Sequence, residues 1–177
     1  MVYTKDTNGQ IQGVQLENYG PQLNTPTLAD QWDKAGRVYF QKYNKILFLS
    51  RTDEPNGGIQ EVYNGPVTTD LAYVDYATFD LTVKCFCASN NYLYLFGRKA
   101  GVNTLVKIDP VSYSFESMEL RKYDVSAMTV TDTDFLTFSA LRNDDAFVVG
   151  SVDINNNRVI ESSTTFDSEI TVLEQVY

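Results

Sequence analysis

The chain has 177 residues, of which 43% are hydrophobic and 13% aromatic, and this length and composition suit one globular domain with a sizeable core. It carries 23 acidic and 14 basic residues, and the resulting net charge of −9 disfavours nucleic acid and anionic membrane surfaces as partners. Histidine is absent, which excludes Ser-His-Asp and Cys-His catalytic groups and any metal site with a histidine ligand.

The first part of the chain predicts one hairpin followed by a long loop. Residues 1–18 hold two short runs with strand character, separated by turn formers at positions 6–9. Residues 19–36 contain proline, asparagine and threonine and predict an extended loop arm, in which Trp32 either packs on the edge of the domain or contacts a partner. No apolar run approaches the ~20 residues needed to span a bilayer, so we expect a soluble chain without membrane insertion.

The rest of the chain predicts an all-β fold built from repeated units. Three similar strand candidates begin at residues 46, 93 and 135, which are 47 and then 42 residues apart. The strands that follow them begin near residues 59, 105 and 147, with nearly the same intervals. The predicted units cover approximately residues 37–80, 81–124 and 125–169. Helical periodicity is missing from this part, so we expect almost no helix.

Each unit resembles a blade of a β-propeller. Turn signals recur after the third strand of each unit, at Asn64-Gly65, at Asp109-Pro110 and at residues 153–157. Four strands in about 45 residues is the size of a propeller blade, although the signatures of the named propeller families are missing. The resemblance implies a single domain over residues 1–177 that forms a small or partial propeller of about four blades, three of them complete. A β-sandwich is the alternative, because it also uses short strands separated by turns.

The two ends of the chain predict parts of one further blade. Residues 170–177 look like the first strand of a unit, and residues 1–18 look like its second hairpin. Together they fall short of a complete blade by about one strand with its turn. Either the chain closes a small ring with this shorter blade, or a protein partner or a second copy supplies the missing strand, because an unpaired strand edge invites pairing.

Few side chains suggest a reaction or a metal site. Cys85 and Cys87 are two residues apart in a strand, so a disulfide between them would strain the backbone, and we expect free thiols. Asp153, Asn155 and Asn157 have the spacing that begins a calcium loop, but a hairpin turn explains the same residues. We assign no catalytic residue, cofactor or metal site, and we do not expect an enzyme.

Tyrosines concentrate in the first two units, and tyrosine offers a rigid ring with a polar tip, as binding surfaces require. We expect several of them to face the surface, Tyr92 and Tyr94 included. The candidate partner contacts are Trp32, Tyr39, Tyr43, Tyr63, Tyr73 and Tyr76.

The sequence therefore favours a non-catalytic protein-interaction or assembly module that acts through blade edges and loops. One alternative is a structural component of a multi-subunit particle such as a phage virion or tail. Another is a small carbohydrate- or calcium-binding domain. The localisation stays open, and free thiols favour the cytoplasm or a virion.

Overall fold

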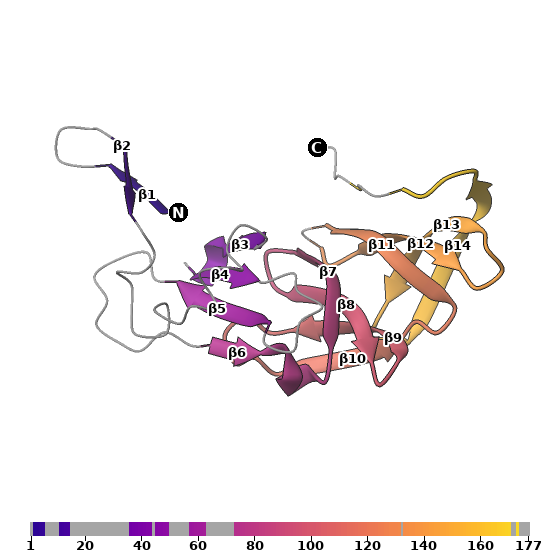
Figure 1. The fold of residues 1–177 in the computed structure, drawn as a ribbon, viewed down its shortest axis with the longest axis horizontal. Helices are drawn as coiled ribbons and strands as arrows, with labels where there is room; N and C mark the ends of the chain where they lie inside the picture. Colours follow the sequence, from indigo (N-terminus) through magenta and orange to yellow (C-terminus); the bar gives the residue numbers. More distant parts are fainter. Residues whose placement is uncertain are drawn as a thin grey trace.

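The computed structural model describes residues 2–5, 11–14, 36–43, 45–49, 57–62, 73–131, 133–170 and 173 (Figure 1). In these residues the regular structure is β-strand apart from two short 3-10 helices, so the all-β prediction is confirmed. The strands are β1 (Val2–Lys5), β2 (Ile11–Val14), β3 (Gly36–Phe40), β4 (Lys45–Leu49), β5 (Gly58–Val62), β6 (Tyr73–Asp75), β7 (Thr82–Ala88), β8 (Leu93–Lys99), β9 (Val102–Ile108), β10 (Phe115–Glu119), β11 (Tyr123–Val130), β12 (Leu136–Arg142), β13 (Phe147–Asp153) and β14 (Arg158–Phe166).

Strands β3 to β14 form three antiparallel sheets of four strands each. In every sheet the strands pair in chain order, giving a first sheet (β3–β6), a middle sheet (β7–β10) and a third sheet (β11–β14). Each predicted unit contains one of these sheets, apart from Gly36 at the start of β3 and from Tyr123 and Asp124 at the start of β11. None of the three sheets closes on itself.

The hairpin predicted in residues 1–18 is present, with Val2 opposite Val14 and Lys5 opposite Ile11. Strands β1 and β2 form a separate sheet, which no other strand of the described residues joins. The turn at 6–9, the loop arm before Gly36 and most of residues 171–177 lie outside the described residues. The predicted sharing of one blade between the two ends of the chain therefore stays a prediction.

The 3-10 helices are η4 (Gln41–Tyr43) and η5 (Tyr76–Phe79). Helix η5 connects the first sheet to the middle sheet, and the Asp75 carboxylate accepts a hydrogen bond from the Ala77 N–H at its start. No helix in the described part of the chain has the length and apolar character required to cross a membrane.

Apolar side chains fill two cores, one on each face of the middle sheet. Leu93 and Leu95 of β8 belong to the core between the first and middle sheets, whereas Tyr94 and Phe96 belong to the core between the middle and third sheets. Because successive strand residues point to opposite faces, five consecutive residues of β8 are buried. The three sheets are thus stacked face to face (Figure 1), a packing that β-sandwiches share with neighbouring propeller blades.

One irregularity recurs in the first strands of the middle and third sheets. Strand β7 has a bulge at Lys84, because Val83 lies opposite Gly97 and Cys85 lies opposite Phe96. Strand β11 has a bulge at Ser126, 42 residues later, between Val125 and Ala127. An extra residue in one strand changes which face the following side chains occupy, so Val83 and Cys85 contact different cores.

Candidate functional site

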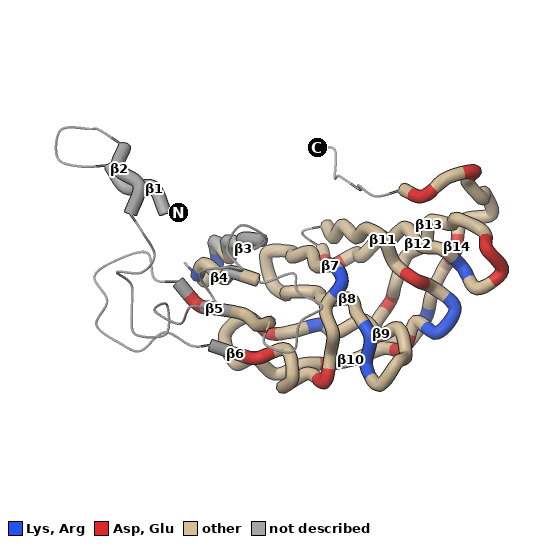
Figure 2. The backbone as a smooth tube through the Cα atoms, viewed as in Figure 1, with Lys and Arg blue, Asp and Glu red and all other residues tan. Residues whose placement is uncertain are grey.

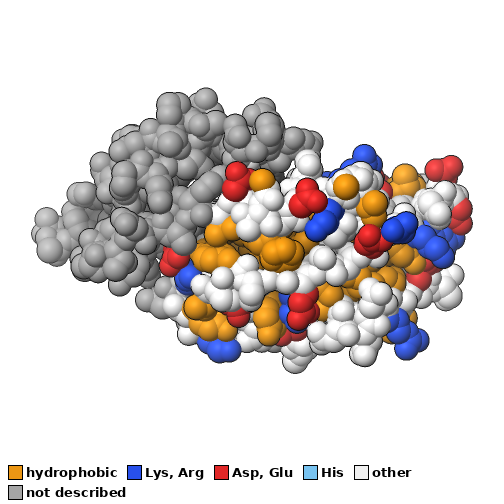
Figure 3. Space-filling model, turned by 90° about the horizontal axis from the view of Figure 1, so that it is seen from below, with side chains coloured by type: hydrophobic (Ala, Val, Ile, Leu, Met, Phe, Trp, Pro, Cys, Tyr) orange, Lys and Arg blue, Asp and Glu red, His pale blue; other side chains and the backbone are white. Residues whose placement is uncertain are grey.

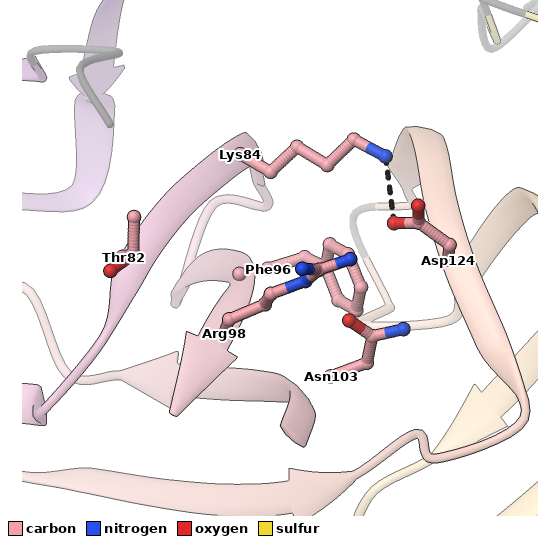
Figure 4. A pocket seen from close by; sticks show the side chains of 7 residues that line it. Thr82, Lys84, Phe96, Arg98, Asn103 and Asp124 are labelled. Atoms are coloured by element: carbon pink, nitrogen blue, oxygen red, sulfur yellow. Dashed lines mark hydrogen bonds and ion pairs between the residues drawn. The ribbon is translucent and has the colours of Figure 1, made fainter. Parts of the chain in front are cut away.

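A pocket lies where the first strands of the middle and third sheets, β7 and β11, run side by side. The hairpin between β8 and β9 forms another of its walls (Figure 4). The pocket has a volume of about 360 Å³. It is lined by Thr82, Lys84, Phe96, Gly97, Arg98, Asn103 and Asp124.

Lys84 extends across this pocket because it is the bulged residue of β7. Its Nζ lies 2.7 Å from Oδ1 of Asp124 on β11, so the ion pair joins the middle sheet to the third sheet. The two side chains remain 44% and 38% exposed, and an ion pair with this exposure contributes little to stability. The pair therefore shapes the charge of the pocket more than it holds the sheets together.

Arg98 directs its guanidinium group into the pocket, toward Asn103 and Asp124 (Figure 4). This group makes no hydrogen bond or ion pair with any residue that the structure describes, although a guanidinium carries five N–H donors. Asn103 donates from Nδ2 to the Tyr123 carbonyl oxygen at 2.8 Å, which leaves its Oδ1 as a free acceptor. Among the described residues, the pocket thus holds a guanidinium group without a hydrogen-bond partner, that of Arg98, beside an acceptor without a donor, Asn103 Oδ1.

Other cations lie near Arg98 at the same end of the sheets. Lys99 follows Arg98 in the β8–β9 hairpin, and Lys122 lies in the β10–β11 connection. This connection contacts the hairpin, because the Leu120 N–H donates a hydrogen bond of 2.7 Å to the Asn103 carbonyl oxygen. Figure 2 shows basic residues where β8 turns into β9. Because neighbouring strands are antiparallel, the turns after β9, β11 and β13 lie at the opposite end of the sheets. Asp109, Asp134 and Asp153 are found at these turns. The β8–β9 hairpin is therefore locally basic in an acidic molecule.

The last strand of each sheet leaves one edge without a partner strand among the described residues. Strand β6 has three residues and β10 has five, whereas β14 has nine. Exposed large apolar side chains occur on these strands, with Phe115 on β10 and Ile160 and Phe166 on β14. Figure 3 views the molecule from the side of β6 and β10 and shows apolar side chains grouped between charged ones.

A second pocket, of about 320 Å³, lies at the acidic end and contains Asp134. The Asp134 carboxylate accepts hydrogen bonds from the hydroxyl groups of Ser89 and Tyr94 and from Asn91 Nδ2, which lies 3.1 Å away. Burial raises the pKa of Tyr94, and the negative charge of Asp134 raises it further, so Tyr94 remains a donor. These contacts tie the β7–β8 turn to the β11–β12 turn, which explains Asp134 as a structural residue.

None of the described tyrosines predicted to contact a partner lines either pocket, whereas Tyr94, which was expected only at the surface, lines the pocket at Asp134. The prediction of surface exposure is wrong for Tyr76 and Tyr94, which are 3% and 2% exposed, because Tyr76 belongs to the core between the first and middle sheets and Tyr94 to the core between the middle and third sheets. Tyr43 is half-buried beside Phe40, with a ring-centroid distance of 6.5 Å. Tyr92 is also half-buried, with the Lys107 ammonium 4.1 Å from its ring centre.

The remaining candidate contacts are not tested by the structure. Trp32 and Tyr63 lie outside the described residues, and the structure describes Tyr39 in β3 and Tyr73 in β6 only as strand positions. They stay predictions.

The cysteines and the Asp153 turn have structural explanations. Cys85 and Cys87 form no disulfide, and their half-buried side chains pack against the core between the middle and third sheets. Burial raises the pKa of Cys87, and Cys85 raises it further, so its thiol stays protonated. Asp153 accepts hydrogen bonds from Asn156 N–H at 3.1 Å and from Asn156 Nδ2 at 2.7 Å, as in a hairpin turn.

Within the described residues, no group of three or more Cys, Asp or Glu side chains is placed to hold a metal ion. The side chains that the structure does bring together are the charged and polar residues at the β7–β11 junction. Comparison of the chain with the known protein families, with curated proteins and with solved structures gives no match.

Proposed function

We propose that this chain is a non-catalytic protein-interaction or assembly module that binds a strand of a second chain at the edge of β14. The observation that carries the proposal is the length and composition of this edge. Strand β14 has nine residues, pairs only with β13 in the described structure, and exposes Ile160 and Phe166. A free strand edge presents unpaired N–H and C=O groups, which a strand from another chain can satisfy.

The side chains of β14 suit strand addition. The register of β14 shifts between Glu161 and Thr165, where residues 162–164 lie opposite Val149 alone, so the regular edge available for strand addition is residues 158–161, which include Ile160. Apart from the ends of the strand, Glu161 is its single charged residue, and few charges protect it from pairing. A second copy of this chain is the simplest source of the added strand, because identical edges can pair with each other about a twofold axis.

We further propose that the three sheets are successive blades of a propeller-like stack. The two bulges support this arrangement because each one contacts the segment that begins the next unit. Lys84 of β7 pairs with Asp124 of β11, and Ser126 of β11 donates from Oγ to the Ile170 carbonyl oxygen at 2.8 Å. The chain after β14 therefore contacts β11 much as β11 contacts β7, which agrees with a further unit that begins near residue 170.

The substitution Ile160→Lys tests the edge proposal. We expect the wild-type chain to associate more as its concentration rises, and the variant to associate at least about tenfold more weakly, because burial of one isoleucine contributes roughly 1.5–3 kcal/mol. Sedimentation velocity over a wide concentration range measures this difference. Val111→Lys is the matched control, because Val111 and Ile160 are both 53% exposed and Val111 lies in the β9–β10 turn.

Equal association of wild type and Ile160→Lys would contradict the role of the β14 edge. A wild-type chain that stays monomeric at every concentration would contradict pairing between two copies. Loss of association in Val111→Lys as well would point to general surface hydrophobicity instead of a strand edge.

A further inference from the structure

We propose that the pocket between β7, β11 and the β8–β9 hairpin is a binding site for a carboxylate group, which Arg98 holds and Lys84 assists. The carboxylate belongs to a small organic acid or to an acidic side chain of a peptide, and both present the same chemistry. This site is separate from the β14 edge, so it does not depend on the proposal made for that edge.

The charges at the pocket favour an anion. Two cations, Lys84 and Arg98, and one carboxylate, Asp124, line it, which leaves an excess of one positive charge in a chain whose net charge is −9. Lys99 and Lys122 lie nearby and form no ion pair with the described residues. Of the acidic side chains at this end, Glu119 pairs with Arg121, and Asp144 and Glu161 both pair with Arg142. The excess positive charge of the lining thus favours a negative group.

Arg98 has the geometry to receive the anion. A guanidinium donates two parallel N–H bonds to the two oxygens of a carboxylate, and these charge-assisted bonds are stronger than neutral ones. All side-chain donors of Arg98 are free with respect to the described residues, and the group points into the pocket (Figure 4). The Lys84 ammonium uses one donor for Asp124 and keeps two for a ligand.

The acceptors in the pocket favour a carboxylate over a phosphate. Asp124 carries a negative charge at the pocket wall and Asn103 presents a free Oδ1, and both would repel a dianion more than a monoanion. The same two acceptors can receive an N–H or O–H that accompanies a carboxylate, as in a peptide segment. We therefore assign the site to a monovalent carboxylate.

The backbone holds this arrangement in place before any ligand binds. The bulge directs Lys84 over the pocket, and Gly97 lets β7 approach β8 so closely that a Cβ at this position would lie 1.9 Å from the Thr82 carbonyl oxygen. Arg98 and Thr82 are paired residues of these two strands, so the strand register sets the position of Arg98 relative to β7. A preformed site loses less conformational entropy on binding.

The test is an NMR titration of the full chain with three probes at matched ionic strength. Sodium acetate represents the free acid, a capped Gly-Glu-Gly peptide represents the acidic side chain, and sodium phosphate tests anion selectivity. We expect acetate and the peptide to shift the amide signals of Gly97, Arg98 and Asn103 in a saturable manner, with phosphate binding more weakly. Substitution Arg98→Gln should weaken carboxylate binding about tenfold or more, since charge-assisted hydrogen bonds are lost.

Two further variants sharpen the result. Lys99→Gln removes a neighbouring cation outside the pocket lining and should change the affinity less than about twofold. Arg98→Lys keeps the charge and removes the two-pronged geometry, so it should bind more weakly than wild type and more tightly than Arg98→Gln. Binding of only one of the two carboxylate probes would identify the source of the group.

Three results would overturn the assignment. The first is that neither carboxylate probe shifts the pocket signals. The second is that Arg98→Gln binds both probes as tightly as wild type does. The third is that inorganic phosphate binds at least as tightly as acetate. A chloride salt that produces the same shifts at equal concentration would likewise show that the signals respond to ionic strength and not to a bound carboxylate.

Discussion

Gly97 allows β7 and β8 to approach each other at the floor of the pocket. Its partner across the strands is Val83, directly before the bulge at Lys84. The space that a side chain would need is occupied by backbone atoms of Thr82 and Val83, which cannot rotate away. The shape of the pocket therefore depends on a position that carries no side chain.

The substitution Gly97→Ala should destabilise the fold by about 3 kcal/mol, because the added methyl group forces β7 away from β8. Urea unfolding followed by circular dichroism measures the change. The control is Gly101→Asn, where φ is +81° and no atom lies within 4 Å of the added Cβ, and asparagine tolerates that conformation. A Gly97→Ala variant as stable as wild type would show that the two strands separate without cost.

Residue-level exposure was the least predictable property of the sequence. The alternation of apolar and polar residues normally indicates which strand face is buried, but β8 is buried on both faces. Tyr94 of β8 consequently looked like a surface residue and is a core residue, and Tyr76 of η5 is also in the core. The bulge at Lys84 also leaves no local sequence signal, so the grouping of Lys84 with Arg98 and Asp124 could not be predicted. The equal intervals between repeat units are the one feature that relates Lys84 to Ser126.

At the scale of elements, the turns were predictable because their side chains act locally. The turn after β9 depends on Asp109, whose Oδ1 accepts hydrogen bonds from the N–H groups of Val111 and Ser112, both at 2.8 Å. The hydrogen bond from Ser112 N–H is the main reason that the pKa of the Asp109 carboxyl lies below its ordinary value. Asp153 has the same function in the β13–β14 turn.

Replacement of Asp109 by alanine should lower stability at neutral pH, because two turn N–H groups lose their acceptor. The pKa of Asp109 is depressed in the folded chain, so its contribution is fully present above the ordinary carboxyl value of 3.8 and is lost as the pH falls through the folded pKa. The stability difference between wild type and Asp109→Ala should therefore shrink below about pH 4.

Denaturant unfolding at a series of pH values measures this dependence. Glu116→Ala, which removes an exposed carboxylate on β10, serves as the control for the loss of one surface charge. A difference between wild type and Asp109→Ala that stays constant down to the lowest pH would contradict the role of the charged carboxylate.

Strand positions could also be predicted, to within one residue for the candidates at 46, 93 and 135, whereas the strand expected near residue 105 begins at Val102. The candidates beginning at 46, 93 and 135 correspond to β4, β8 and β12, which begin at Lys45, Leu93 and Leu136. Their β-branched and aromatic residues, bounded by turn formers, are local signals. How the sheets pack on one another is not local, and for that reason the sequence left a propeller and a sandwich as alternatives.

At the scale of the whole molecule, the middle sheet connects two otherwise separate cores. Leu95 and Phe96 are neighbours in β8 and are both fully buried, but Leu95 contacts the core with the first sheet and Phe96 contacts the core with the third sheet. The stability of the first and third sheets should therefore depend on different residues of one strand.

Leu95→Ala and Phe96→Ala should each destabilise the chain by about 3 kcal/mol, because each leaves a cavity in a core. Hydrogen exchange should separate them, with faster exchange in β4 and β5 for Leu95→Ala and in β12 and β13 for Phe96→Ala. Identical exchange patterns in the two variants would contradict the presence of two cores.

The central claim is that the chain assembles through the edge of β14. Hydrogen exchange of the wild-type chain at low and high concentration tests it most directly, because a newly paired strand protects its backbone amides. We predict slower exchange in β14 at high concentration, with β6 and β10 unchanged. Association without added protection in β14, or protection confined to another strand, would contradict the account.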